Sequence, residues 1–218
     1  MLKETQVKIM IELQAKMNAK VNPQWVEAAY PYLRAVVVEG AEAIEHHGWK
    51  WWKKQDCDLP QLQMELVDIW HFALSHILLE KRGDEDAAMT ELQHLANAGD
   101  TLDFDGKTIN INTLDALQKL ELTIGLASSG RLSIPLFEGL LGDCGMDWNE
   151  LFCQYVGKNV LNFFRQDHGY KEGTYQKMWE GKEDNEHLVE AMAGLDADHA
   201  DFQHSLYESL RDRYQRTR

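Results

Sequence analysis

The stretch that decides the fold runs from residue 62 to residue 74 and reads LQMELVDIWHFAL. Large apolar residues fall on nearly every side of a helix with this sequence, so we expect the helix to be buried. Two acids, Glu65 and Asp68, stand three positions apart and therefore on one face of that helix. A buried carboxylate without a partner is costly or is driven to its neutral form. The pair therefore predicts a cation or a base beside this helix.

An earlier apolar stretch repeats the arrangement. Residues 36–44 read VVVEGAEAI and carry Glu39 and Glu42 at the same spacing. If the two helices face each other, four carboxylates converge, and oxygen donors with no cysteine nearby suit magnesium or manganese better than zinc. A single pair at this spacing is more often ordinary helix surface than a ligand set. The apolar residues around Glu65 and Asp68 favour the metal site.

The composition limits the class of protein. A length of 218 residues suits one sizeable core, or a core with a smaller appendage. We expect a cytoplasmic protein without a membrane partner, because there is no long apolar run and no signal-like start. Three cysteines without metal-type spacing are expected to be reduced thiols. A net charge of −14 argues against duplex nucleic acid as a partner, but a nucleotide needs only a local positive patch.

Helical periodicity and only four prolines predict an all-α protein. The expected helices cover 4–19, 24–47 with a break or start near Pro31, 61–82, 85–97, 112–129, 147–166 and 185–214. Asp105-Gly106 could close a hairpin, but its flanks lack strand alternation and a loop is expected. Residues 84–146 carry no evident chemistry. We expect them to form a smaller helical subdomain, inserted into a catalytic core made of residues 1–83 and 147–218.

The most basic segment of this acidic chain lies between residues 158 and 185. It holds 5 of the 22 lysines and arginines, namely Lys158, Arg165, Lys171, Lys177 and Lys182. Glycines at 169, 173 and 181 predict a loop over its second half. Bases mixed with tyrosine and asparagine are what a polyphosphate and a nucleobase require. A solvated turn whose charges pair with neighbouring acids is an equal alternative for this segment alone.

Together these residues resemble the dimeric all-α dUTPase family, within the wider class of all-α nucleoside triphosphate pyrophosphatases. The two acidic pairs stand in that family's order, and the aromatic-basic run WKWWK follows at 49–53. The elements KNVLN, RQ, GYKEGTY and EDN stand in order between 158 and 185. The resemblance implies an all-α helical bundle that forms a homodimer. It also implies magnesium-dependent hydrolysis of dUTP, and of dUDP, to dUMP.

The resemblance further implies roles for individual residues. Magnesium, or manganese, would be held by Glu39, Glu42, Glu65 and Asp68. Of these, Glu39 and Glu42 would be catalytic, and Glu39 would orient or deprotonate the attacking water. Phosphate contacts are expected from Lys158, Arg165, Tyr170, Lys171 and Lys177. Uracil contacts are expected from Gln14, Asn18, Trp51 and Asn185, with Trp49 and Trp52 competing with Trp51. The deoxyribose would lie against His71 and Phe72.

Two other interpretations stay open. A relative with another nucleotide preference is one, because the acidic pairs belong to the wider class and the base contacts do not. The other is a carboxylate di-iron bundle, which needs Glu-x-x-His pairs on facing helices. Glu91 and His94 fit that pattern once, and Asp68 with His71 fits it approximately. A second convincing pair is missing, and the basic segment would have no purpose there.

Overall fold

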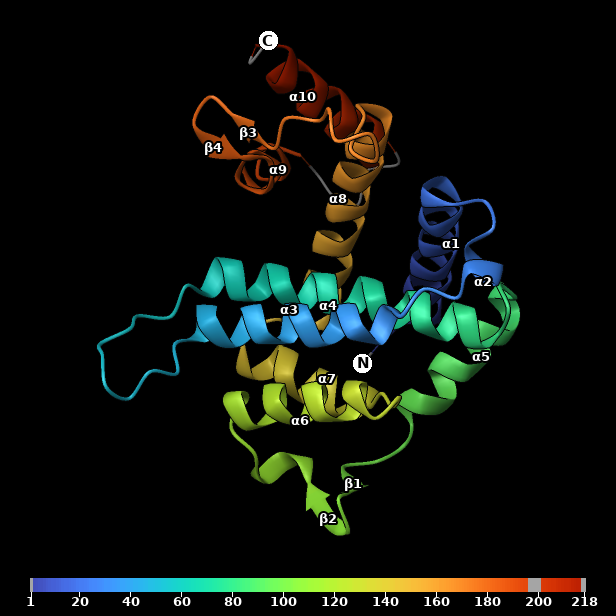
Figure 1. Ribbon diagram of the computed structural model, residues 1–218, viewed down its shortest axis with the longest axis vertical. Coiled ribbons are helices and arrows are strands. Elements are labelled where there is room, and N and C mark those ends of the chain that lie inside the picture. The colour runs from blue at the N-terminus through green and yellow to red at the C-terminus, as the bar shows by residue number, and fades with distance from the viewer. Residues whose placement is uncertain (1, 196–200, 217–218) are drawn as a thin grey trace.

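Two antiparallel helices form the centre of the molecule. The computed structural model describes residues 2–195 and 201–216. Helix α4 (Leu59–Glu80) is the predicted buried helix, and the side chain of Asp58 caps its first turn by accepting from the Gln61 N–H. Helix α3 (Tyr32–His47) runs beside α4 along its length (Figure 1). The carboxylates of both helices are therefore placed by one helix pair.

The other helices pack around this pair. Helices α1 (Glu4–Val21) and α8 (Trp148–Asp167) contact α4 and each other. Helix α6 (Ala116–Ser128) covers α3 from the opposite side and packs against α7 (Ile134–Asp143) (Figure 1). Helix α5 (Glu85–Ala96) bridges α1, α4 and α7. Helices α9 (Asp184–Met192) and α10 (Phe202–Arg216) pack on α8, at its end farther from α3 (Figure 1).

The predicted all-α fold is confirmed, with corrections inside it. The expected helix over 24–47 is divided into α2 (Trp25–Ala28) and α3, because Ala29 takes a left-handed conformation before Pro31. The expected single helix over 185–214 is wrong. Helix α9 ends at Met192, a turn follows at 193–195, and α10 begins at Phe202. Residues 196–200 of that prediction lie outside the described residues.

The loop expected around Asp105-Gly106 is a hairpin. Strands β1 (Thr101–Phe104) and β2 (Lys107–Asn110) pair antiparallel, and both turn residues have positive φ, 48° and 71°. A two-residue turn of this kind matches the twist of the paired strands. A second, shorter pair joins β3 (Met178–Trp179) to β4 (Lys182–Glu183), where only a loop was expected. Helix α7 was not predicted at all, although Ser133 caps it.

Residues 84–146 contribute to two hydrophobic clusters. Leu92, Leu120 and Phe137 belong to the same core as the apolar residues of α4. A smaller cluster, built on Ile111 and Leu122, joins the hairpin to α6 and α7. The division into a catalytic core and an inserted subdomain stays a prediction. Among the described residues, no helix combines the length and apolarity that crossing a membrane requires.

Helix α3 approaches α6 closely at Gly40, which suggests a test of the packing. A Cβ at Gly40 would lie 2.7 Å from Cγ1 of Ile124, whereas a Cβ at Gly142 in α7 would meet nothing within 4 Å. Gly142→Ala is expected to raise the free energy of unfolding by about 0.5–1 kcal/mol. Gly40→Ala should lose that gain, because overpacking costs about 1–3 kcal/mol. Equal stabilisation in denaturant titrations would contradict the close approach of the two helices.

Candidate active site

The structure brings three of the four predicted carboxylates together. Oxygens of Glu39 and Glu42 on α3, and of Glu65 on α4, all lie within 4.8 Å of one another. Spacing of three residues keeps each pair on one helix face, and the packing of α3 against α4 turns the two faces toward each other. Asp68 lies one turn beyond Glu65, where its Oδ2 accepts from Nζ of Lys158 at 2.8 Å. Lys158 is therefore the base that the sequence predicted beside the acids of this helix.

The carboxylates of this cluster resist full ionisation. Burial raises the pKa of Glu39 to about 8, and the charges of Asp68, Glu65 and Glu42 add to the effect. Burial also raises the pKa of Glu65 to about 7, with Asp68 raising it further and Lys158 opposing the rise. The direct contact between the two side chains raises the pKa of Glu39 and lowers that of Glu65. Closely spaced oxygen donors that repel one another fit a small divalent cation such as magnesium or manganese.

Two cavities meet at this cluster. One, of about 640 Å³, is lined by the four carboxylates together with Lys158, Lys177 and Asn185. The other, of about 670 Å³, is lined by Gln14, Asn18, Phe72 and Ser75, and by apolar residues of α1 and α3. Five residues line both cavities: Glu39, Asp68, Lys158, Arg165 and Tyr170. The site is therefore continuous, with a charged half and a less polar half.

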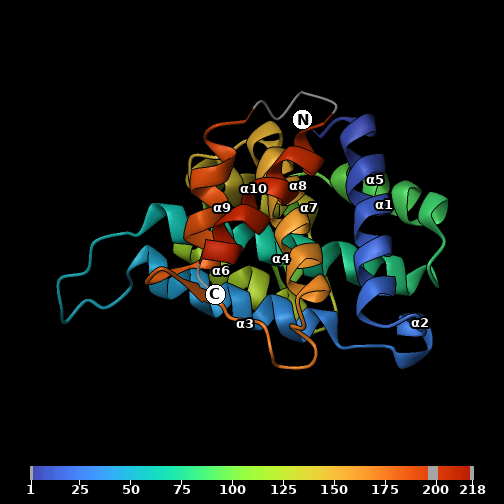
Figure 2. The ribbon, with the colours of Figure 1, turned by 90° about the horizontal axis from the view of Figure 1, so that it is seen from above.

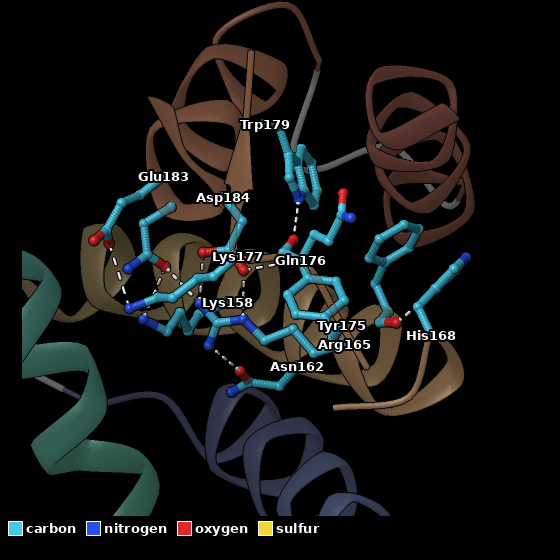
Figure 3. A network of polar contacts seen from close by, with 12 residues as sticks. Lys158, Asn162, Arg165, His168, Tyr175, Gln176, Lys177, Trp179, Glu183 and Asp184 are labelled. Atoms are coloured by element: carbon cyan, nitrogen blue, oxygen red, sulfur yellow. Dashed lines mark hydrogen bonds and ion pairs between the residues drawn. The ribbon is translucent and has the colours of Figure 1, made fainter. Parts of the chain in front are cut away.

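The basic wall is held by a buried carboxylate. Arg165 donates from Nε and Nη2 to both oxygens of Asp184, each at 2.8 Å, and the Tyr175 hydroxyl donates to Asp184 Oδ2 at 2.8 Å (Figure 3). Asp184 is fully buried. Arg165 also donates to Asn162 at 3.1 Å and to Asn185 at 3.3 Å. Among the described residues, four of its five N–H groups are thus engaged, and the predicted phosphate contact would use the fifth.

The remaining residues predicted to bind phosphate are placed differently from one another. Tyr170 lines both cavities, and its ring lies 5.8 Å from the Arg165 guanidinium. Lys177 lines the charged cavity and lies 3.4 Å from a carboxylate oxygen of Glu183. Lys171 lines neither cavity, because its Nζ donates to the carbonyl oxygen of Val21 at 2.9 Å.

Two residues predicted to contact uracil lie away from the less polar cavity. Trp51 is 85% exposed on the loop of residues 48–58, which extends away from the helices in both views (Figure 1, Figure 2). This loop joins α3 to α4 and leads into the first turn of α4, the helix that carries Glu65 and Asp68. Asn185 lines the charged cavity, where its Oδ1 accepts from Lys158 at 3.1 Å. A uracil contact from either residue stays a prediction.

Gln14 and Asn18 lie in a buried polar network at the less polar end. The Gln14 amide is 2.8 Å from His71 Nδ1, 2.9 Å from Tyr155 Oη, 2.8 Å from Ser75 Oγ and 3.2 Å from the Asn18 amide. Burial lowers the pKa of His71 to about 3, so its ring is neutral at pH 7. His71 therefore supports Gln14 within this network, while half-buried Phe72 forms a wall of the cavity.

The sequence interpretation missed three residues of the site. Ser75, Tyr155 and Asp184 all make buried hydrogen bonds to predicted site residues. Ser75 lies one helical turn beyond His71 on α4, a spacing that could have drawn attention to it. The di-iron alternative gains no support, because Glu91 pairs with Lys81 at 2.7 Å and lines neither cavity.

Comparison with known proteins identifies the family. A family model described as dUTPase matches residues 6–170, a span that holds both acidic pairs, Gln14, Asn18 and Lys158. No curated protein matches the chain. The match ends before Lys171, Lys177 and Asn185. Since it covers well over half of the 218 residues, the chain belongs to the all-α dUTPase family and is a nucleoside triphosphate diphosphatase.

Proposed function

We propose that this protein is a magnesium-dependent dUTP diphosphatase that converts dUTP, and also dUDP, to dUMP. The observation that carries the proposal is the shared wall of the two cavities. A less polar chamber with buried amides opens at Glu39, Asp68 and Lys158 onto a chamber of carboxylates and bases. A nucleotide is divided in the same way, into a less polar base and sugar and a charged phosphate chain.

The order of residues along α4 supports this placement. Glu65, Asp68, Phe72 and Ser75 follow one another on the side of the helix that lines the cavities. Ten residues of helix, from Glu65 to Ser75, span about 15 Å. That length accommodates a phosphate chain near Glu65, a sugar near Phe72 and a base near Ser75.

The chemistry follows from the residues on the shared wall. Glu39, Glu42, Glu65 and Asp68 would hold magnesium, which when bound offsets phosphate charge and makes a coordinated water more acidic. Glu39 orients the attacking water and accepts its proton. Lys158 and Tyr170 contact phosphate oxygens from the opposite side.

We further infer a homodimer that acts in the cytoplasm, with no nucleic-acid or membrane partner. The resemblance to dimeric relatives supports the dimer. Cys57, Cys144 and Cys153 form no disulfide among the described residues, which suits a reducing compartment. The charge of −14 disfavours nucleic acid. Manganese is an alternative metal, since it shares the preference for oxygen ligands.

A nucleotide panel tests the substrate assignment. The purified protein with magnesium is expected to release pyrophosphate from dUTP and phosphate from dUDP, and to hydrolyse dCTP, dTTP, dATP and UTP more slowly. Ion chromatography of the products distinguishes pyrophosphate from phosphate. Faster hydrolysis of a nucleotide without uracil would keep the family and overturn the base assignment.

The metal assignment is tested by Glu65→Gln, which keeps the size of the side chain and removes its charge. We expect kcat/KM for dUTP to fall on the order of 100-fold or more, because the buried carboxylate is lost from the cluster. Glu12→Gln, on the outer part of α1, is the matched control and should leave kcat/KM unchanged. Half or more of the activity remaining in Glu65→Gln, or in protein treated with EDTA, would make the acids structural.

Magnesium binding should release protons near neutral pH. Because Glu39 and Glu65 have pKa values of about 8 and 7, the metal-free site holds protons at pH 7 that a cation displaces. Magnesium affinity should therefore rise from pH 6 to pH 9. The stability that these protons give the metal-free fold is fully present below the ordinary glutamate pKa of 4.5 and should be lost as the pH rises to about 8. Calorimetry in buffers of different ionisation enthalpy measures the release, and none at pH 7 would contradict these shifts.

Phe72 is expected to exclude a ribose 2′-hydroxyl. Its ring lines the less polar cavity one turn beyond Asp68, and an unpaired hydroxyl buried there costs roughly 1–3 kcal/mol. Phe72→Ala should raise the ratio of kcat/KM for UTP to that for dUTP by about 10-fold or more. Val189→Ala, an exposed position on α9, is the control. A folded Phe72→Ala variant with an unchanged ratio would remove Phe72 from the sugar site.

A further inference from the structure

Helix α10 lies outside the site described so far, but it packs on the helix that carries the basic wall. None of its described residues lines either cavity, whereas the helix contacts both α8 and α9. Its buried residues stand at every fourth position and so form one stripe, made of Phe202, Leu206, Leu210 and Tyr214. Tyr214 is 1% exposed, and its ring lies among those of Phe164, Tyr175 and Trp179. The end of α10 therefore brings an aromatic side chain against the segment between α8 and β3.

Tyr214 holds this segment, residues 168–177, through two contacts. Its ring stacks on that of Tyr175, with the centroids 5.4 Å apart and the planes inclined by 23°. Its hydroxyl oxygen accepts from the Gln176 N–H at 3.2 Å. The Gln176 carbonyl oxygen accepts from Trp179 Nε1 at 2.7 Å (Figure 3). Both backbone groups of Gln176 are therefore bonded to aromatic side chains that lie outside the two cavities.

The part of the segment that Tyr214 holds is connected to the basic wall. Tyr170 precedes this part and Lys177 follows it, and both line the charged cavity. The Tyr175 hydroxyl donates at 2.8 Å to Asp184, the carboxylate that holds Arg165. Burial raises the pKa of Tyr175 well above its ordinary value, so the hydroxyl keeps its proton and remains a donor at neutral pH. A shift of the segment would therefore displace three of the side chains that are predicted to contact phosphate.

We propose that Tyr214 is a positioning residue for the basic wall, which it holds, through Tyr175 and Gln176, at the place where the phosphates of a nucleotide bind. Tyr214 lines neither cavity and touches no substrate. The wall contacts phosphates in the ground state and in the transition state alike, so its displacement should weaken binding more than catalysis. The choice of base should not depend on Tyr214. The inference rests on the proposed function, because it requires phosphates in the charged cavity.

Tyr214→Phe tests the positioning role, because it keeps the ring and removes the acceptor of the Gln176 N–H. We expect KM for dUTP to rise roughly 3- to 10-fold and kcat to stay within about 2-fold, since the acids of α3 and α4 are untouched. Tyr207→Phe is the matched control on the same helix, because its hydroxyl donates to Asp167 at 2.8 Å, and its KM should not change. Leu206→Val, a change at a fully buried position of α10, should lower the melting temperature and leave KM unchanged. An unchanged KM in Tyr214→Phe, or an equal rise in Leu206→Val, overturns the proposal.

Binding of inorganic pyrophosphate in the presence of magnesium separates this proposal from the proposed function. Pyrophosphate has no base, so its affinity reports on the charged cavity alone. Calorimetry should give a Kd for pyrophosphate that is roughly 3- to 10-fold higher for Tyr214→Phe than for the wild-type protein. If the wild-type protein prefers a nucleotide without uracil while this difference is found, the proposed function fails at the base and the positioning role stands. Equal affinities in the two proteins overturn the positioning role, whichever nucleotide is preferred.

Discussion

Mutual repulsion among carboxylates on two packed helices is the constraint on which the site depends. Glu39, Glu42 and Glu65 are held close by the contact between α3 and α4, and that contact is supported by the apolar residues of both helices. The helices cannot separate to relieve the repulsion without exposing the core. The free energy of packing therefore maintains a concentration of negative charge that only protons, a base or a cation can offset.

The fourth acid shows how the protein divides this charge. Asp68 is paired with buried Lys158, while Glu65 lies 3.6 Å from Nε2 of half-buried His46 and interacts with Lys158 only through its charge. Lys158 comes from α8, so the helix that completes the cluster also begins the basic wall. Lys158 thus lies between the carboxylates, which would hold a cation, and the basic residues of α8.

Local sequence predicted the helices and the acid pairs, because periodicity and burial of a helix face are properties of neighbouring residues. It could not predict Asp184 as the partner of Arg165, since that contact joins α8 to α9 across the intervening residues 168–183. The hairpin was missed because Leu102 and Phe104 alternate over too few positions, and the strands are stabilised by packing on α6 and α7. Trp51 was predicted from an aromatic-basic run, but the path of its loop depends on contacts such as that of Trp49 with Glu45.

The buried contact between Arg165 and Asp184 has a consequence for how a nucleotide enters. Asp184 also accepts from Tyr175, so one carboxylate fastens the segment after α8 back onto α8 before any ligand arrives (Figure 3). Asn185, the next residue, is fixed between Lys158 and Arg165 by the same contact. The wall that we propose faces the phosphates is therefore preorganised, and association does not have to overcome the conformational entropy of ordering it.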